Sequence, residues 1–310
     1  MYSEKINELF SEQLSSWELA RLNYRELSKV RTRKLSFDGF EVQVQFNPAR
    51  IISSSAKVDV RSIEERPCFL CTGNRPKEQT GISLDDDMII LVNPFPIFRR
   101  HLTIPCASHI DQRIIKNFSQ MLFLSQAMHL YTVFYNGPQS GASAPDHMHF
   151  QAGNIGFMPI EMDFTGGRHS RLVSSVPGLE VWKWEGYLRG IITLRGNDGD
   201  KLSGVFGKLF ESLSRRQPER PEPMMNILSG YSSDEWTIHI FPRKQHRPRQ
   251  FFLSGDDRLL LSPAAVDLGG VLITPREEDF DKITGEDVID IFSQVCYNDI
   301  EIEAFISEII

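Results

Sequence analysis

The chain has 310 residues, 41% of them hydrophobic and 24% charged, with a formal net charge of −7. This composition is ordinary for a soluble globular protein, and the length allows one large domain or two closely packed halves. The acidic balance argues against a general nucleic-acid binder, which needs a basic surface, and no apolar run reaches the roughly 20 residues that span a bilayer.

Two features of the chain predict a cytoplasmic protein. The N-terminal segment contains acidic residues and lacks the apolar core of a secretory signal. Four cysteines are too few for a disulfide framework, so the reducing cytoplasm is the expected compartment. Neither a membrane nor a nucleic acid is expected as a partner. A small anionic substrate stays open, because a local basic pocket is enough to bind one.

Helices and strands alternate in the first half of the chain. Residues 3–27 have apolar residues at helical spacing and predict one N-terminal helix or a pair. Residues 53–67 have the composition of a loop, and an apolar stripe predicts a helix over 111–130. Alternation or a short apolar run predicts strands over 37–48, 88–98, 101–109, 131–137 and 147–153.

The second half begins near residue 155 and has the same mixture of elements. Helices are predicted over 199–216 and 285–298, and the proline-containing segment 215–223 is the most linker-like piece. Strands are predicted over 179–186, 187–196, 225–231, 235–243 and 269–275. Because each half has strands around one amphipathic helix, we predict an α+β architecture of two similar halves.

The segment NGPQSGASAPDHMHFQAG, residues 136–153, joins a small polar loop to a predicted strand. Alternate side chains of a strand share one face, so His147, His149 and Gln151 point toward one region. Gly and Ser in the loop can present N–H groups and hydroxyls to an anion. A neutral imidazole is a nucleophile toward phosphorus. The pattern predicts a phosphate site in which His149 attacks and the Gln151 amide donates to a phosphoryl oxygen.

An amide cannot transfer protons, so Gln151 favours transfer to a second substrate over activation of water. Each part of the segment also has a plainer explanation. A His-x-His pair on a strand is a zinc arrangement or only structural, and a Gly-Ser loop before a strand is usually a turn. The combination with Asn136 and Gln151 is more specific than any of its parts.

Cys68 and Cys71 in PCFLCTGN have the spacing of two zinc ligands on one tight turn. A redox pair and two buried cysteines without a metal are the alternatives. A tetrahedral zinc needs two more ligands, for which His109 and His147 are the first candidates and His101 is the reserve.

The segment WTIHIFPRKQHRPRQFF, residues 236–252, is the most basic window of this acidic chain. A charge run of this kind is commonly a solvated face. The functional alternative is contact with substrate phosphates or with a second anionic substrate, and Arg243 is the candidate for it.

These motifs resemble the transferase branch of the histidine-triad superfamily. That branch includes galactose-1-phosphate uridylyltransferase, diadenosine tetraphosphate phosphorylase and the GDP-hexose phosphorylases. Its motif is His-x-His-x-Gln after an Asn and a small-residue loop, here NGPQSGASAPDHMHFQ. CFLCTGN is similar to the zinc segment of the uridylyltransferases, LVNPFPIFRRHLTIPCASH to the strand pair under the nucleotide, and GGVLITPREEDF to a C-terminal segment of the phosphorylases. The resemblance covers residues 45–285 and is strongest over 66–153.

The resemblance implies a role for each matched residue. His149 matches the nucleophile that becomes a nucleotidyl-histidine, and Gln151 matches the amide that holds a phosphoryl oxygen. The implied structural zinc has four ligands: Cys68, Cys71, His109 and His147. The implied contacts to nucleotide and phosphate are Asn136, Ser140, Gly141 and Ser143. Asn93 and Phe95 in NPFPIF are candidates for the base pocket, with a plain strand end as the alternative.

The fold that the resemblance implies is two histidine-triad-like halves, residues 1–155 and 156–310, each an antiparallel sheet with packed helices. The implied activity moves a nucleotide from a nucleoside diphosphate sugar or a dinucleoside polyphosphate, through a covalent histidine intermediate, to phosphate or a sugar phosphate. A GDP-hexose phosphorylase type is favoured. The alternatives are a nucleotide-binding protein without turnover and a zinc-stabilised structural protein. Dimers are frequent in the family, so a homodimer is an option that the sequence leaves open.

The chain also departs from the family pattern. Phe150 stands where the uridylyltransferases have Gly, and the segment WTIHIFPR has no second His-x-His pair, which argues against a second metal site. The phosphorylase relatives often lack zinc. Hydrolase members carry His where this chain has Gln151, which argues against a hydrolase.

Overall fold

The fold is that of a computed structural model, which describes residues 2–51, 60–84 and 87–310. Of the predicted loop 53–67, residues 53–59 lie outside this part, and the prediction is wrong for the next five residues, which form α4 (Val60–Glu64). Within the described ranges, no helix has both the length and the apolar character needed to cross a membrane.

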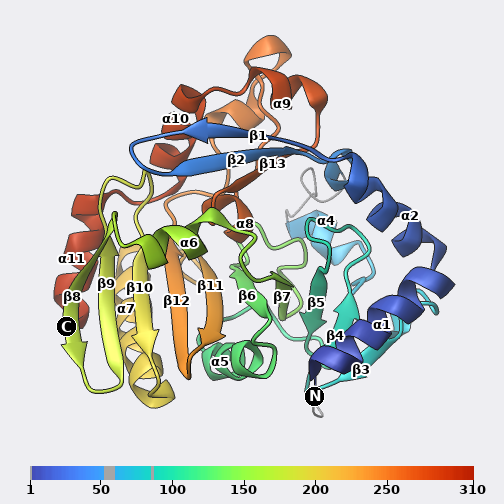
Figure 1. Ribbon diagram of the computed structural model, residues 1–310, viewed down its shortest axis with the longest axis horizontal. Coiled ribbons are helices and arrows are strands. Elements are labelled where there is room, and N and C mark those ends of the chain that lie inside the picture. The colour runs from blue at the N-terminus through green and yellow to red at the C-terminus, as the bar shows by residue number, and fades with distance from the viewer. Residues whose placement is uncertain (1, 52–59, 85–86) are drawn as a thin grey trace.

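A ten-stranded antiparallel sheet forms the centre of the molecule (Figure 1). Its first five strands lie in the order β3-β4-β5-β7-β6, and the next five repeat this order in mirror image as β11-β12-β10-β9-β8. β6 and β11 pair at the middle, so the two halves share one continuous sheet. The predicted α+β class with antiparallel strands is confirmed. The strands are β3 (Gly81–Ser83), β4 (Ile89–Val92), β5 (Leu102–Pro105), β6 (Tyr131–Asn136), β7 (His149–Asn154), β8 (Ser170–Val176), β9 (Leu179–Trp184), β10 (Ile192–Gly196), β11 (Met225–Ser232) and β12 (Glu235–Pro242).

Alternation along the strands sorts side chains between two hydrophobic cores, one on each face of the sheet. Tyr135 on β6 and Phe150 on β7 belong to one core, whereas Phe134 belongs to the other. Because neighbours along a strand point to opposite faces, His149 and Gln151 point to the face of Phe134.

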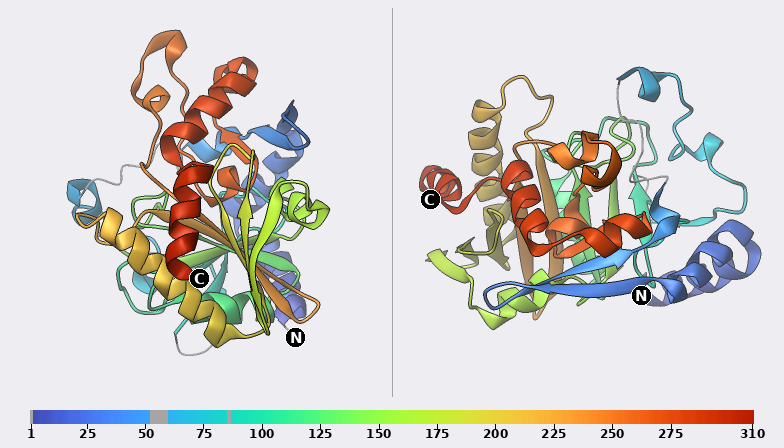
Figure 2. Two further views of the ribbon diagram at one scale, coloured as in Figure 1. Left: turned by 90° about the vertical axis from the view of Figure 1, so that its left-hand side faces the viewer. Right: turned by 90° about the horizontal axis from the view of Figure 1, so that it is seen from above.

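Four helices cover the face of Tyr135 and Phe150 (Figures 1 and 2). They are α1 (Tyr2–Ser16), α5 (Phe118–Ala127), α7 (Gly199–Arg216) and α11 (Asp299–Ile309). In α7 the buried apolar residues Leu202, Phe206, Leu209 and Leu213 recur every three or four positions, which makes one apolar stripe. Phe118 of α5 stacks on Phe206 of α7 with ring centroids 3.9 Å apart, so the helices of the two halves join over the middle of the sheet. α2 (Glu18–Glu26) follows α1, which confirms the predicted N-terminal pair.

The helix predicted over 111–130 is shorter than expected and begins at Phe118. The preceding segment turns its polar groups inward instead. The side chain of Gln112 is fully buried and binds the main chain of β6 and β7. The N–H of Ile114 donates to Glu222. These contacts satisfy the segment outside a helix, which helical periodicity alone cannot reveal.

A smaller sheet covers the other face of the main sheet. Figure 1 shows it above the main sheet. Its strands are β1 (Arg31–Ser36), β2 (Glu41–Phe46) and β13 (Val271–Thr274), and β13 runs parallel to β2. Because β13 comes from the C-terminal half, this sheet ties the two halves together. Helices α6 (Pro159–Gly166), α8 (Ala265–Leu268), α9 (Glu277–Lys282) and α10 (Gly285–Val295) pack around it, and a short turn, η2 (Pro48–Arg50), follows β2.

Candidate active site

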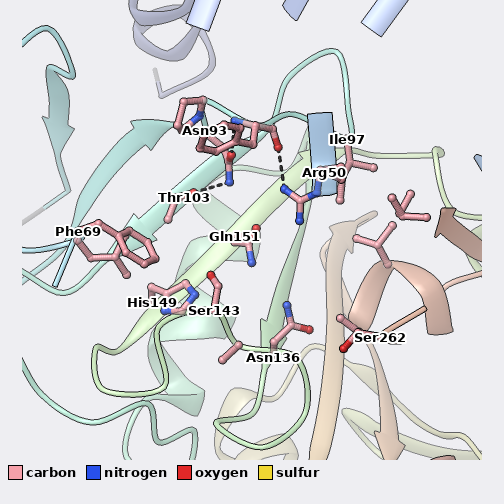
Figure 3. A pocket seen from close by; sticks show the side chains of 18 of the residues that line it. Arg50, Phe69, Asn93, Ile97, Thr103, Asn136, Ser143, His149, Gln151 and Ser262 are labelled. Atoms are coloured by element: carbon pink, nitrogen blue, oxygen red, sulfur yellow. Dashed lines mark hydrogen bonds between the residues drawn. The ribbon is translucent and has the colours of Figure 1, made fainter. Parts of the chain in front are cut away.

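A cavity of about 660 Å³ lies on this second face of the main sheet (Figure 3). Seven residues that the sequence analysis selected line it: His149, Gln151, Asn136, Gly141, Ser143, Asn93 and Phe95. Ser140 and Arg243 are fully buried and do not line it. The cavity therefore gathers residues from β6, β7, the loop between them and the turn after β4.

His149 opens β7 and is held in a single protonation form. Its Nδ1 lies 2.8 Å from the carbonyl oxygen of His147. Because a carbonyl can only accept, Nδ1 carries the proton and Nε2 keeps its lone pair. Burial lowers the pKa of His149 to about 4, against the opposing effect of the His147 carbonyl, so the ring is neutral at pH 7. A neutral imidazole with an unprotonated nitrogen is the form that a nucleophile requires.

Gln151 follows on the same face, and His101 fixes which end of its amide faces the cavity. The N–H of Ile97 donates to His101 Nδ1 at 3.2 Å, so His101 Nε2 carries a proton and donates to Gln151 Oε1 at 3.0 Å. Burial, reinforced by Arg50, lowers the pKa of His101 to about 3 and keeps this ring neutral. The amide nitrogen of Gln151 is left facing the cavity (Figure 3). His101, held in reserve as a zinc ligand, orients Gln151 instead.

Asn136 ends β6 and presents a second amide nitrogen to the cavity. Its Oδ1 accepts from the side chain of Asn226 at 2.8 Å and from the N–H of Ala265 at 2.9 Å, which leaves Nδ2 facing the cavity, toward Gln151 (Figure 3). Asn226 is in turn held by Arg243, whose Nη1 donates to Asn226 Oδ1 at 2.5 Å. Arg243 thus supports the site from behind, through Asn226, and its predicted contact with a phosphate stays a prediction.

The loop between β6 and β7 approaches the start of α8 closely at Gly141. This residue has a φ of 99°, in the left-handed region, and an added Cβ would lie 2.7 Å from the Cβ of Ala264. Glycine is therefore required for the loop to reach this position. Ser143 then faces the cavity, whereas the carbonyl of Ser140 accepts from Asn226 at 2.7 Å and anchors the loop.

Gln112 bridges β6 and β7 where the two strands part. Their ladder stops at the pair Phe134–Gln151, two residues before Asn136 and His149. Beyond it, Gln112 Nε2 donates to the carbonyls of Asn136 and His149, both at 3.0 Å, and its Oε1 accepts from the N–H of His149 at 2.8 Å. One carboxamide thus replaces the missing ladder bonds and holds the main chain of the nucleophile. The sequence analysis missed this residue, and its only signal is a polar side chain inside a predicted apolar helix.

The turn after β4 forms another wall of the cavity. Asn93 Oδ1 accepts from the N–H of Phe95 at 2.9 Å, and its Nδ2 donates to Thr103 Oγ1 at 2.9 Å, so the side chain shapes the turn itself. The carbonyl of Phe95 accepts from Arg50 Nη1 at 2.8 Å, which joins this wall to η2. Asn93 and Phe95 remain candidates for the base pocket.

The four predicted metal ligands meet beside the cavity. The ligand atoms of Cys68, Cys71, His109 and His147 all lie within 4.8 Å of one another. Cys68 Sγ and Cys71 Sγ lie 3.3 and 3.6 Å from His147 Nδ1, and Cys71 Sγ lies 3.2 Å from His109 Nδ1. Tetrahedral zinc with ordinary bond lengths places sulfur and nitrogen about 3.5 Å apart.

The surroundings of His147 also suit a metal ligand. Its Nε2 lies 2.9 Å from the carbonyl of Cys106, which accepts a hydrogen bond from Nε2–H and leaves the lone pair of Nδ1 for the metal. Burial lowers the pKa of His147, which favours the neutral ring that binds metal. Two thiols and two imidazoles are a zinc donor set, so these residues fit the group.

The second half has the same strand register as the half with His149 and Gln151, but aromatic side chains occupy the equivalent position. By the register of the strands, His239 on β12 holds the place that Gln151 has on β7. Its Nδ1 lies 2.8 Å from Thr193 Oγ1, and the rings of Phe164 and Trp184 lie against it. His239 does not line the cavity, so this half contributes packing where the first half has polar groups.

Each half of the chain matches a known protein domain family. Residues 9–154 match a domain of unknown function, DUF4922, and residues 167–310 match the GDPGP1-like C-terminal domain. No curated protein matches the sequence.

Among solved structures, the chain is similar to yeast Ap4A phosphorylase Apa2. Its complex with Ap4A superposes with a TM-score of 0.60 at 17% identity, over 91% of this chain and 97% of that chain. Its complex with AMP gives a TM-score of 0.57 at 18% identity, over 90% and 94%. At these identities the likeness establishes the fold.

Proposed function

We propose that the chain belongs to the transferase branch of the histidine-triad superfamily and that it is a nucleotidyltransferase of the phosphorylase type. One observation carries the proposal: the cavity holds a neutral His149 with an unprotonated Nε2 beside the amide nitrogens of Gln151 and Asn136. A nucleophile between two fixed donors is what attack on a phosphoryl group requires.

In the first half-reaction, His149 Nε2 attacks the α-phosphorus of the donor. A bond forms between Nε2 and phosphorus, and the bond from phosphorus to the bridging oxygen breaks. The leaving group takes the electron pair and departs as a sugar phosphate or a nucleotide. The positive charge that the ring gains is shared with the His147 carbonyl, which accepts from Nδ1–H. No proton has to leave the ring.

The amide nitrogens and the loop stabilise the charge of the transition state. That charge lies on the phosphoryl oxygens, since phosphoryl transfer passes through a loose transition state. Gln151 and Asn136 donate to these oxygens, and Ser143 adds a hydroxyl from the loop. Their direction is set before substrate binds, through His101 and Asn226. Fixed donors of this kind are worth on the order of 10²- to 10³-fold in rate each.

In the second half-reaction, phosphate or a sugar phosphate attacks the same phosphorus and His149 leaves with its lone pair restored. The amide of Gln151 cannot take a proton from water, which favours such an acceptor over hydrolysis. Because the donor product leaves before the acceptor reacts, the kinetics are ping-pong.

The donor is a nucleoside diphosphate sugar or a dinucleoside polyphosphate. The GDPGP1-like C-terminal domain supports the first class, with a GDP-hexose favoured, and the likeness to an Ap4A phosphorylase supports the second. A cavity of about 660 Å³ accommodates either nucleotide part.

Cys68, Cys71, His109 and His147 would hold the zinc, which would supply structural cross-linking and no chemistry. These ligands would then join the segment of the two cysteines to the loop that ends at His149. The proposed compartment is the reducing cytoplasm, because the four cysteines of the chain are too few for a disulfide framework.

The test is turnover of UDP-, GDP- and ADP-sugars and of diadenosine polyphosphate in the presence of phosphate. We expect His149→Ala to lose at least about 10³-fold in kcat with donor affinity little changed, since it removes the nucleophile and no base contact. His129→Ala, at an exposed helix end, is the matched control and should keep full activity. Equal activity of the two variants would show that His149 is not the nucleophile.

A further inference from the structure

The basic window that the sequence analysis singled out divides into three parts in the structure. Arg243 is buried behind the cavity, and Arg249 pairs at the surface with Asp290 at 2.8 Å. Between them, His246 and Arg247 line the cavity. The mechanism above uses neither of these two side chains.

Ser262 joins His246 and Arg247 in one cluster. Arg247 Nε donates to Ser262 Oγ at 3.1 Å, and Ser262 Oγ lies 3.4 Å from His246 Nε2. The guanidinium of Arg247 lies over the ring of Phe251, 4.1 Å from its centroid, which restricts its orientation. All three polar residues line the cavity, and in Figure 3 Ser262 lies on the other side of Asn136 from His149.

Buried Arg243 fixes this cluster to the rest of the site. Its Nη2 donates to the carbonyl of His246 at 2.9 Å, and its Nη1 donates to the carbonyl of Pro263, the neighbour of Ser262, at 3.0 Å. The same Nη1 holds Asn226, which orients Asn136. The guanidinium of Arg243 thus fixes the position of the cluster relative to Asn136, the residue of β6 that donates to the phosphoryl group.

We propose that His246, Arg247 and Ser262 form the subsite for the phosphate group of the second substrate. The inference rests on the proposed function, because it assigns the acceptor of the same cavity. By microscopic reversibility, the cluster also holds the phosphate that leaves in the first half-reaction.

The chemistry of the cluster fits a phosphate. A guanidinium fork matches two phosphate oxygens, and a hydroxyl donates to a third. Burial, reinforced by Arg247 and Arg243, lowers the pKa of His246 to about 3, so this neutral ring can donate to one oxygen and accept from a protonated one.

The carboxylate that lines the same cavity does not oppose an anion at the cluster. Asp267 Oδ1 accepts from the N–H of Ile273 and Oδ2 from that of Ala264, both at 2.9 Å, and Arg50 lies near enough to stabilise its charge. The main chain therefore engages both oxygens of this acid.

The second half-reaction, measured by itself, tests the subsite separately from donor binding. Enzyme carrying the nucleotide on His149 is freed of donor, and discharge is followed by mass against increasing inorganic phosphate, hexose 1-phosphate, or neither. We expect Arg247→Gln to raise the half-saturating phosphate concentration about 10- to 100-fold, the loss of one charge-assisted contact. Arg247→Lys keeps the charge without the guanidinium fork, so its half-saturating phosphate concentration should lie between those of the unaltered chain and of Arg247→Gln. Ser262→Ala should weaken phosphate binding less than Arg247→Gln.

Two controls are internal to the experiment. Arg249→Gln removes a neighbouring surface arginine and should leave the phosphate dependence unchanged. Slow discharge by water, with neither acceptor present, should be the same in all variants, because no acceptor phosphate is held. Saturation by inorganic phosphate alone, or by hexose 1-phosphate alone, identifies which source of the group the subsite accepts. A phosphate dependence in Arg247→Gln equal to that of the unaltered chain would overturn the proposal.

Failure of the proposed function would appear earlier, as no adduct with any donor. The subsite is then tested by calorimetric titration of the intact protein with inorganic phosphate. Binding that is lost in Arg247→Gln and kept in Arg249→Gln would support the subsite. No binding to the unaltered chain, or equal binding to both variants, would overturn it.

Discussion

Gln112 gives the sharpest prediction about how the fold controls the site, since the chain contains a matched glutamine elsewhere. Gln112 Nε2 donates to the carbonyls of Asn136 and His149, and its side chain is fully buried. Gln13 in α1 is also fully buried, and its Nε2 donates to Glu78 O and to Thr80 Oγ1, both at 2.8 Å. Replacement by Glu removes two donated hydrogen bonds at either position and changes the side-chain volume little.

The two variants should lose similar stability and differ in chemistry. The two lost hydrogen bonds, with acceptors left unsatisfied, lower the free energy of unfolding by about 2–4 kcal/mol in each, and burial of the carboxylate adds a penalty of several kcal/mol to both. Only Gln112→Glu loosens the main chain of His149, which loses the bond to its carbonyl and keeps the one from its N–H. Because a displacement on the order of 1 Å costs about 10²-fold in rate, adduct formation at saturating donor should slow by about 10- to 100-fold in this variant.

The assay pairs urea unfolding with single-turnover adduct formation over a range of donor concentrations. A positioning role predicts a lower maximal rate for Gln112→Glu with a nearly unchanged donor concentration for half-saturation, and normal kinetics for Gln13→Glu. Equal slowing of the two variants would show that Gln112 acts only through the stability of the fold. A normal rate in Gln112→Glu would refute its role in positioning His149.

Three further predictions concern the metal, the pH and the buried support of Asn136. The purified chain should contain about one zinc per molecule by elemental analysis. Cys68→Ser should lose this zinc together with several degrees of thermal stability, whereas the control Cys296→Ser should keep it. Equal zinc content in the two variants would refute the ligand set. Burial lowers the pKa of His239 to about 3, so the unfolded chain alone takes up this proton as the pH falls below about 6.5, which costs about 2 kcal/mol of stability by pH 5. His239→Gln should shrink the difference in unfolding free energy between pH 7 and pH 5 by that amount, as measured by urea titration, and an unchanged difference would contradict it. Asn226→Ala should slow adduct formation about tenfold by freeing the amide of Asn136, whereas an unchanged rate would show that Asn136 is oriented by other groups.

The local pattern of the sequence was enough to predict the strands that carry the site. Alternation over 147–153 placed His147, His149 and Gln151 on one face, and the structure has His149 and Gln151 on β7 facing one cavity. His147 precedes this strand and lies in the cluster of metal ligands instead. The spacing of Cys68 and Cys71 selected a tight turn, and the four suggested ligands do come together. The strand and the Cys68–Cys71 turn depend on residues close together in the chain, which a local pattern can reveal. His109 and His147 lie 38 to 79 positions from the cysteines that they contact, and the resemblance supplied the complete set of four.

Residues that act across the fold left no local pattern. Gln112 binds groups 24 and 37 positions away, and Asn226 reaches Asn136 across 90. Arg243 stood out as a charge, but its charge alone could not show that it is buried among carbonyl groups. β1 was missed because its sequence RTRKLS is largely exposed and pairs on one side only, with β2. Such positions follow from sheet order and strand register, which only the folded chain defines.

Intact-protein mass after incubation with donor, in the absence of phosphate or any other acceptor, tests the central claim most directly. The donors are UDP-, GDP- and ADP-sugars and diadenosine polyphosphate. The account predicts a gain equal to one nucleoside monophosphate with at least one donor, absent in His149→Ala and removed by later addition of the acceptor. The base of the adduct would name the nucleotide. Turnover of a donor with no adduct, or an adduct that persists in His149→Ala, would contradict a covalent mechanism through His149.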